Sequence, residues 1–156
     1  MRRVLLLALL LASPVSAQDD DPFARGMLAA NAREFAEALR LWRPLAEAGD
    51  SRAAYHVAMV LERGEGIPAD PAEAARFYGA AARAGHAEAG NALAILLVEG
   101  RGLAPDPITA WAWFALAAER GSGFAGANRD HLGGRLTAAE QVQARARLTE
   151  LRAAGP

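Results

Sequence analysis

The sequence predicts an all-α fold, a right-handed α-solenoid of about four antiparallel helix pairs. Of its 156 residues, 40 are Ala, which is both the strongest helix former and the smallest apolar side chain that packs in a core. Residues of like kind also recur every 36 positions. A fixed period of this length is typical of stacked repeats, because each helix pair buries its apolar face only against its neighbours. The recurring sets are glycines (Gly49, Gly85, Gly121), large rings (Trp42, Tyr78, Phe114) and alanines (Ala38, Ala74, Ala110).

The first 17 residues have the three parts of a secretory signal peptide. Arg2 and Arg3 give a basic start, an apolar run covers 4–12, and Ala17 stands at the position before cleavage. The run is too short to span a bilayer, for which about 20 residues are needed. We therefore expect cleavage after Ala17 and a periplasmic or secreted bacterial protein. Residues 18–156 would then form a single domain.

The first predicted repeat covers roughly 22–52. Its helices are expected at 22–31 and 35–48, joined by a short turn. The second of these helices carries Ala38, Trp42, Leu45 and Ala46 at helical spacing. This repeat has no glycine-rich loop between its helices.

The next two repeats, roughly 53–88 and 89–124, share one design. In the first of them, helices are expected at 53–63 and 71–84. Gly64 and Gly66 end the earlier helix, and Ile67 is expected to anchor the loop by packing into the core. The later helix begins with Asp70 as its N-cap and Pro71 as its first residue. The following repeat places its helices at 88–99 and 107–120, with the corresponding residues Gly100, Gly102, Leu103, Asp106 and Pro107.

The C-terminal stretch 125–153 predicts an atypical capping repeat. A short helix over 124–132 is followed by a Gly133-Gly134 turn. Thr137 and Glu140 then form a capping box for a last helix that ends at about Ala153. The outward side chains of this helix are polar, as a terminal repeat requires.

The two central repeats resemble Sel-1-like repeats, which are relatives of tetratricopeptide repeats with a longer loop between the helices. The resemblance implies a solenoid that serves as adaptor, scaffold or regulator through protein–protein contacts. It brings no catalytic residues with it. The matching residues are Ala53, Val57, Ala58, Leu61, Gly64, Gly66, Ile67, Asp70, Ala74, Tyr78, Ala81, Ala82 and Gly85, and their counterparts 36 positions later.

The composition excludes several other classes of protein. Without Cys there is no disulfide scaffold, thiol chemistry or Cys-ligated zinc. With a formal net charge of −1, the near-zero charge balance excludes a broad basic surface for nucleic acid. His56, His86 and His131 lack metal-site spacing and are interpreted as surface or cap residues. No catalytic, cofactor-binding or metal-binding residue is predicted.

A partner-binding surface is expected on the first helices of the repeats. By the resemblance, these helices line the concave face of the solenoid. The alternative interpretation is that Met59, Ile95 and Val98 simply pack between repeats. Trp111 and Trp113 cannot face the same way on a helix, so we expect one ring in the core and the other against a neighbouring helix or exposed. The predicted groove residues are Arg52, Tyr55, Met59, Glu62, Asn91, Ile95 and Val98.

Three functional hypotheses follow from the sequence. The leading one is a periplasmic or secreted module that binds a protein or peptide partner in the groove. The second is an envelope enzyme or a factor that binds cell-wall peptidoglycan or polysaccharide. The third is a component that assembles with other chains or with itself.

Overall fold

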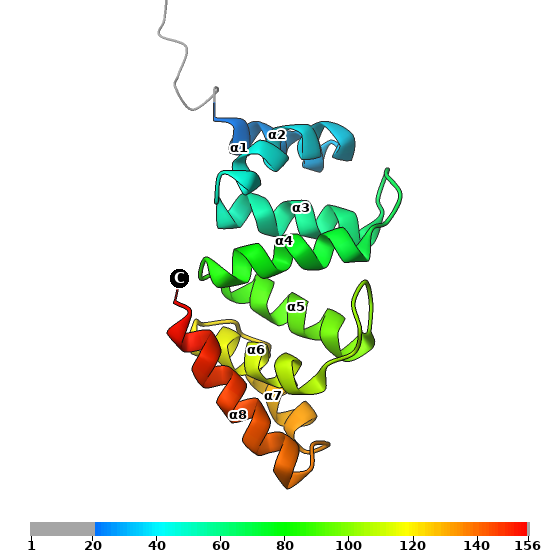
Figure 1. The fold of residues 1–156 in the computed structure, drawn as a ribbon. Coiled ribbons are helices and arrows are strands. Elements are labelled where there is room, and N and C mark those ends of the chain that lie inside the picture. Colours follow the sequence, from blue (N-terminus) through cyan, green and yellow to red (C-terminus); the bar gives the residue numbers. More distant parts are fainter. Residues whose placement is uncertain (1–20, 156) are drawn as a thin grey trace, which may run out of the picture.

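The computed structural model describes residues 21–155, and within this range helices are joined by turns and loops, with no β-strand. Of the eight helices in this range, α1 to α7 follow one another down a column, and α8 turns back along α6 (Figure 1). The helices are α1 (Pro22–Asn31), α2 (Phe35–Glu47), α3 (Ser51–Arg63), α4 (Pro71–Arg83), α5 (Ala87–Glu99), α6 (Pro107–Glu119), α7 (Ala125–Gly133) and α8 (Ala138–Ala153).

From α1 to α7, each helix packs against the next one along the chain. The long loops after α3 and α5 project on the same side of the column (Figure 1). This arrangement confirms the predicted all-α solenoid of helical repeats. The predicted signal peptide lies outside the described residues. Among the helices that are described, none combines the length and apolar character needed to cross a bilayer.

The helix ends follow the local signals in the sequence. Asp70 and Asp106 accept a hydrogen bond from the backbone N–H three residues on, at 2.8 and 2.9 Å, and a proline follows each of them. Gly64 and Gly100 end α3 and α5 in the left-handed conformation, as predicted. The Thr137–Glu140 capping box is present.

Helix α3 begins at Ser51, two residues before the predicted start. The reason is Asp50, whose carboxylate accepts from the backbone N–H groups of Arg52 and Ala53 at 2.9 and 3.1 Å. An N-cap aspartate satisfies two of the donors that the first turn leaves free, so the helix starts immediately after it. In the same way His86 caps α5, which begins at Ala87.

The repeating positions form the core. Ala38, Ala74 and Ala110 are fully buried, and the rings of Trp42, Tyr78 and Phe114 fill the space beside them. The two tryptophans of α6 differ in burial, as expected. The ring of Trp113 is buried, whereas Trp111 is half-buried against the end of α7, where Gly133 leaves room for the indole.

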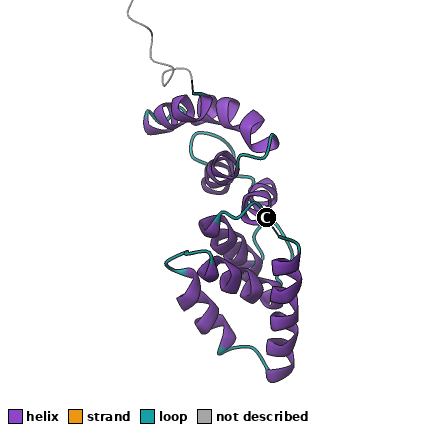
Figure 2. Cartoon of the chain, turned by 90° about the vertical axis from the view of Figure 1, so that its left-hand side faces the viewer, coloured by secondary structure: helices purple, strands orange, loops and turns teal. Residues whose placement is uncertain are grey.

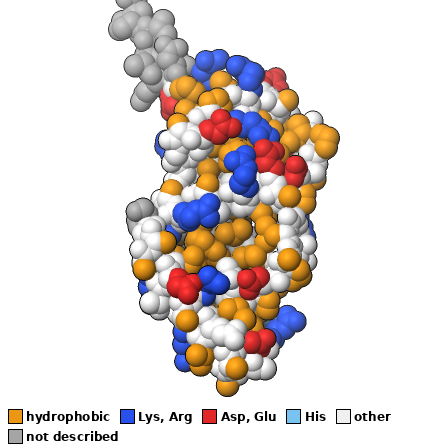
Figure 3. Space-filling view, viewed as in Figure 1, with side chains coloured by type: hydrophobic (Ala, Val, Ile, Leu, Met, Phe, Trp, Pro, Cys, Tyr) orange, Lys and Arg blue, Asp and Glu red, His pale blue; other side chains and the backbone are white. Residues whose placement is uncertain are grey.

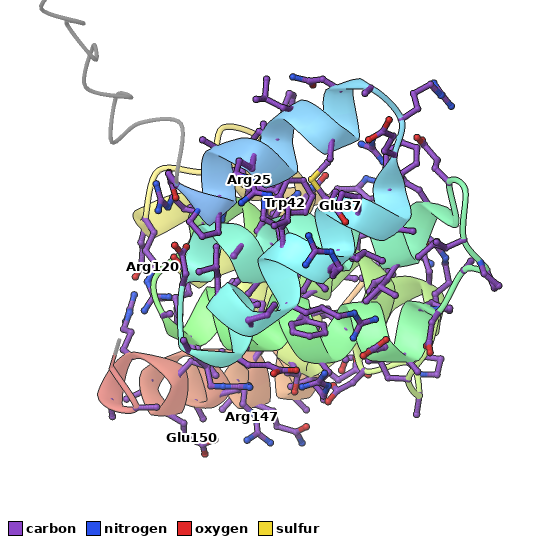
Figure 4. All side chains as sticks on the ribbon, turned by 90° about the horizontal axis from the view of Figure 1, so that it is seen from above. Arg25, Glu37, Trp42, Arg120, Arg147 and Glu150 are labelled. Carbon is purple, nitrogen blue, oxygen red and sulfur yellow. The ribbon has the colours of Figure 1, made fainter. Side chains whose placement is uncertain are left out.

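The last two helices do not form an ordinary repeat pair. Both α7 and α8 pack on α6, and they diverge from the turn that joins them (Figure 2). Helix α7 is short, so α8 uses its buried residues Ala144 and Leu148 to cover α6 instead. On the exposed side of α8, Arg147 and Glu150 form an ion pair at 2.7 Å (Figure 4).

The face viewed in Figure 1 carries hydrophobic side chains across the middle of the column, bordered by charged side chains (Figure 3). This face belongs to the second helices of the repeats. The first helices, α1, α3, α5 and α7, lie on the opposite side (Figures 1 and 2). The groove residues predicted from the sequence belong to α3 and α5, so the candidate site lies on this opposite side.

Candidate partner-binding surface

The seven predicted groove residues lie on α3 and α5 and fall into two groups according to what their side chains contact. Some of them hold consecutive repeats together through contacts within the chain. The others line two separate hollows, one toward each end of the solenoid. The sequence alone did not distinguish these two groups.

Aromatic rings follow one another across α1, α2 and α3. Trp42 stacks on His56 with ring centroids 5.0 Å apart, and Tyr55 stacks on His86 at 4.4 Å. The guanidinium of Arg52 lies 4.5 Å from the centre of the Phe23 ring. It also pairs with Asp50 at 2.9 Å. Tyr55 and Arg52 are thus already engaged within the chain.

The predicted polar groove residues are also engaged. Glu62 accepts hydrogen bonds from the Tyr78 hydroxyl at 2.8 Å and from Arg101 at 3.0 Å. Burial and the neighbouring Glu62 carboxylate together raise the pKa of Tyr78 well above its usual range. The Asn91 side chain accepts from Asn128 at 2.9 Å. The bonds of Glu62 to Arg101 and of Asn91 to Asn128 join one repeat to the next, whereas the bond of Glu62 to Tyr78 joins the two helices of one repeat. The polar side chains in the middle of the first-helix face are therefore already bonded within the chain.

A first hollow, called here the N-terminal hollow, has a volume of about 350 Å³. Met59 forms part of its apolar lining, and two arginines stand among its polar residues. It is bounded by α1, the α1–α2 turn, α2, α3 and the loop after α3. Its lining residues are Met27, Ala30, Asn31, Arg33, Phe35, Trp42, His56, Met59, Val60, Arg63 and Glu65.

A second, smaller hollow, the C-terminal hollow, has a volume of about 160 Å³. Ile95 and Val98 line it, so these residues do not pack only between repeats. One carboxylate and one guanidinium stand among its lining residues. The lining comprises Ile95, Val98, Glu99, Phe114, Asn128, His131, Leu132 and Arg135.

The histidines were interpreted from the sequence as surface or cap residues, and the structure refines this. His86 caps α5 by accepting from the Ala89 N–H at 3.3 Å through Nδ1. His56 is half-buried in the aromatic row, whereas His131 is exposed. Burial lowers the pKa of both His56 and His86. Among residues 21–155, no group of three His, Asp or Glu side chains is placed to hold a metal ion.

These two histidines predict a pH dependence of stability. A histidine whose pKa is lowered on folding binds its proton more readily in the unfolded chain, so stability falls as pH falls below the unfolded pKa of about 6.5. Protonation also removes the Nδ1 lone pair that caps α5. We expect the melting temperature to fall between about pH 7 and pH 5, above the range in which carboxylates titrate.

Thermal unfolding followed by circular dichroism across this range measures the effect. Asn is a good N-cap and does not titrate. In the variant His86→Asn, the fall between pH 7 and pH 5 should be roughly halved, with the remainder due to His56. A melting temperature that is flat over this interval in the unchanged protein contradicts the role given to both rings.

The comparisons with known proteins agree with this geometry. The family model described as Sel1 repeat matches residues 51–86 and 87–122. No curated protein matches the sequence. Two bacterial crystal structures are similar to the chain. One is a protective antigen of uropathogenic Escherichia coli that displays an SLR fold, with a TM-score of 0.78 and 27% identity over 86% of this chain.

The other is a Sel1 repeat protein from Oxalobacter formigenes, with a TM-score of 0.64 and 28% identity over 76% of this chain. The chain spans 30% of the length of the first structure and 51% of the second. Residues 51–122 are therefore two Sel1 repeats within an SLR fold. Such repeats are typically protein–protein interaction modules, and the family is generally of a non-catalytic scaffold type.

Proposed function

We propose that this Sel1-repeat protein is a periplasmic or secreted adaptor that binds a protein or peptide partner on its concave face, at the N-terminal and C-terminal hollows. The observation that carries the proposal is that this face has two kinds of region, one whose polar side chains are bonded within the chain and one that forms open hollows. In its middle, Glu62 and Asn91 are bonded to the next repeat, whereas Met59, Ile95 and Val98 line hollows that the described chain leaves open. Hollows lined by both apolar and charged residues suit the side chains of an incoming segment.

Site-specific photo-crosslinking in intact cells tests the proposal. A photoreactive phenylalanine analogue is placed at Met59, at Ile95 or at Val142, an exposed apolar residue on the far side of α8. We expect discrete protein adducts from positions 59 and 95 and none from 142. A second change, Met59→Asp or Ile95→Asp, should reduce the adduct at the other hollow about tenfold if one partner spans both hollows, because it replaces an apolar contact of the partner with a carboxylate that must be desolvated on binding. Val142→Asp serves as the control.

The same experiment also tests the predicted location of the protein. The adducts should be recovered from the periplasm or the medium, and the chain in them should begin at Gln18. Equal adduct patterns at all three positions, with the fold intact by circular dichroism, would remove the concave face from consideration.

The alternative function, an envelope enzyme or cell-wall-binding factor, has less support. The half-buried carboxylate of the concave face, Glu62, is held by Tyr78 and Arg101 and is not directed into either hollow. Sedimentation of the protein with purified peptidoglycan, undiminished by Met59→Asp and Ile95→Asp together, would favour this alternative over the adaptor.

A further inference from the structure

Four short turns join consecutive helices without a glycine-rich loop, and one of them, between α1 and α2, differs from the other three in the residue that adopts positive φ. Three of these turns share a design in which a glycine follows the helix in the left-handed conformation. Its N–H donates to the carbonyl three residues back at 3.1 Å, and the next N–H donates to the carbonyl five residues back. The glycines are Gly49, Gly85 and Gly121, with φ of 97°, 93° and 97°.

The α1–α2 turn makes the same hydrogen bonds with an arginine. The Arg33 N–H donates to the Ala30 carbonyl at 3.0 Å, and the Glu34 N–H donates to the Ala29 carbonyl at 2.8 Å. Arg33 has a φ of 64° and is the one non-glycine residue with positive φ in the range 21–155. A side chain with a Cβ is strained in this region of backbone space, and glycine is not. The chain therefore keeps an arginine where its own other turns use glycine.

Contacts within the chain do not account for this arginine. Its side chain is 78% exposed, and the nearest carboxylate, Glu65, lies 3.9 Å away, beyond hydrogen-bond distance. The guanidinium carbon lies 5.8 Å from the centre of the Phe35 ring, near the outer limit for a cation–π contact. An exposed ion pair of this kind contributes little to stability.

The position of Arg33 does give it a use, because it stands among the residues that line the N-terminal hollow. Arg63 lines the same hollow, and it is exposed. Within the described chain it forms no side-chain hydrogen bond or ion pair. Glu65 is the single carboxylate among the lining residues, so two guanidinium groups face one carboxylate. This excess of positive charge lies on a chain whose net charge is −1.

We propose that the N-terminal hollow selects a peptide segment in which an apolar side chain is followed or preceded within two residues by Asp or Glu. The apolar side chain enters between Met27, Phe35 and Met59, and the flexible thioethers of the two methionines adapt to its shape. The carboxylate pairs with Arg33 and Arg63 at the rim. The inference rests on the proposed function and gives its partner a chemistry. The C-terminal hollow, with Glu99 and Arg135 in balance, makes no such selection.

Selection from a phage-displayed library of random 12-residue peptides supplies the probe. The purified protein should enrich peptides that carry Leu, Met or Phe next to an acidic residue. For the enriched peptides, Arg33→Gln and Arg63→Gln should each weaken binding roughly five- to tenfold, as expected for loss of a charge-assisted contact, and Arg33→Lys should retain most of it. Affinity should also fall with added salt. Arg145→Gln, on the exposed part of α8, is the charge-matched control.

Arg33→Gly separates a binding role from a structural one. It relieves the backbone strain, so the melting temperature should rise by about 2–4 °C, while binding of the acidic peptides weakens as in Arg33→Gln. A structural role would instead lower the melting temperature, and that result overturns the inference.

The remaining outcomes distinguish this inference from the proposed function. The enriched peptides could instead lack acidic residues. If Arg33→Gln leaves their binding unchanged and Met59→Asp or Ile95→Asp abolishes it, the acidic selection is overturned and the adaptor function stands. If no peptide is retained better by the unchanged protein than by the Met59→Asp, Ile95→Asp double variant, both are overturned.

Discussion

Trp42→Ala should destabilise the protein by about 3–5 kcal/mol, the cost typical of removing a large buried aromatic side chain. Trp42 is 1% exposed and reaches from α2 into α1 (Figure 4). Its indole N–H donates to the Phe23 carbonyl at 3.2 Å, and its ring stacks on His56 of α3. Gly26 leaves the room for it, because a Cβ there would overlap the indole. One ring thus joins the first three helices.

Urea unfolding followed by circular dichroism measures this loss. A domain of this size is typically stable by about 5–15 kcal/mol, so the change is a large share of the total. Trp42→Phe keeps a ring and loses the hydrogen bond, and it should cost about 1–2 kcal/mol. Trp111→Ala, at a half-buried ring, should cost less than Trp42→Ala. If Trp42→Ala costs no more than Trp111→Ala, the indole is not the centre of the N-terminal core.

Local signals account for how much of the fold the sequence could predict. Asp70 and Pro71, Gly64 and Gly100, and the pair Thr137 and Glu140 act through the few residues beside them. Their effect is therefore visible in the sequence, and the helix ends that they predict are confirmed. The 36-residue period likewise indicated which alanines and rings would be buried, because each repeat offers the same place to the same residue.

The bonds that hold Glu62 and Asn91 to the next repeat have no such local signal. Asn91 and Asn128 are 37 residues apart, and Glu62 and Arg101 are 39 apart. These separations differ from 36 by a few residues, because a side chain on one helix reaches a neighbouring position on the next repeat. A search for complementary polar pairs at separations of 36 to 39 could have found both. The packing of α8 on α6 has no counterpart in the repeat and could not be read from its period.

The glycine-rich loops show a second limit of the sequence interpretation. Gly64 and Gly66 were both assigned to ending the helix, and so were their counterparts Gly100 and Gly102. The first glycine of each pair does this. The second lies against a different repeat. A Cβ on Gly66 would stand 3.2 Å from the Phe35 ring of α2, and a Cβ on Gly102 would overlap the backbone of Pro71 and Ala72 at the start of α4.

Gly102→Ala should therefore destabilise the protein by about 2–5 kcal/mol, because two costs combine. Gly102 has a φ of 76°, at which a Cβ costs roughly 1–2 kcal/mol. The overlap with α4 adds the cost of moving backbone, typically about 1–3 kcal/mol in a packed interior. A helix start cannot yield as a side chain does, so Gly66→Ala, which meets only the Phe35 ring, should cost less.

Two matched glycines separate these costs in urea unfolding. Gly49 has a φ of 97° and no heavy atom within 4 Å of an added Cβ, so Gly49→Ala reports the backbone strain alone, roughly 1–2 kcal/mol. Gly123 has open space and no positive φ, so Gly123→Ala should change little. The excess for Gly102→Ala over Gly49→Ala then measures the close approach of the α5–α6 loop to α4. An excess near zero would mean that the loop does not hold these two repeats in register, and that stacking rests on the helices alone.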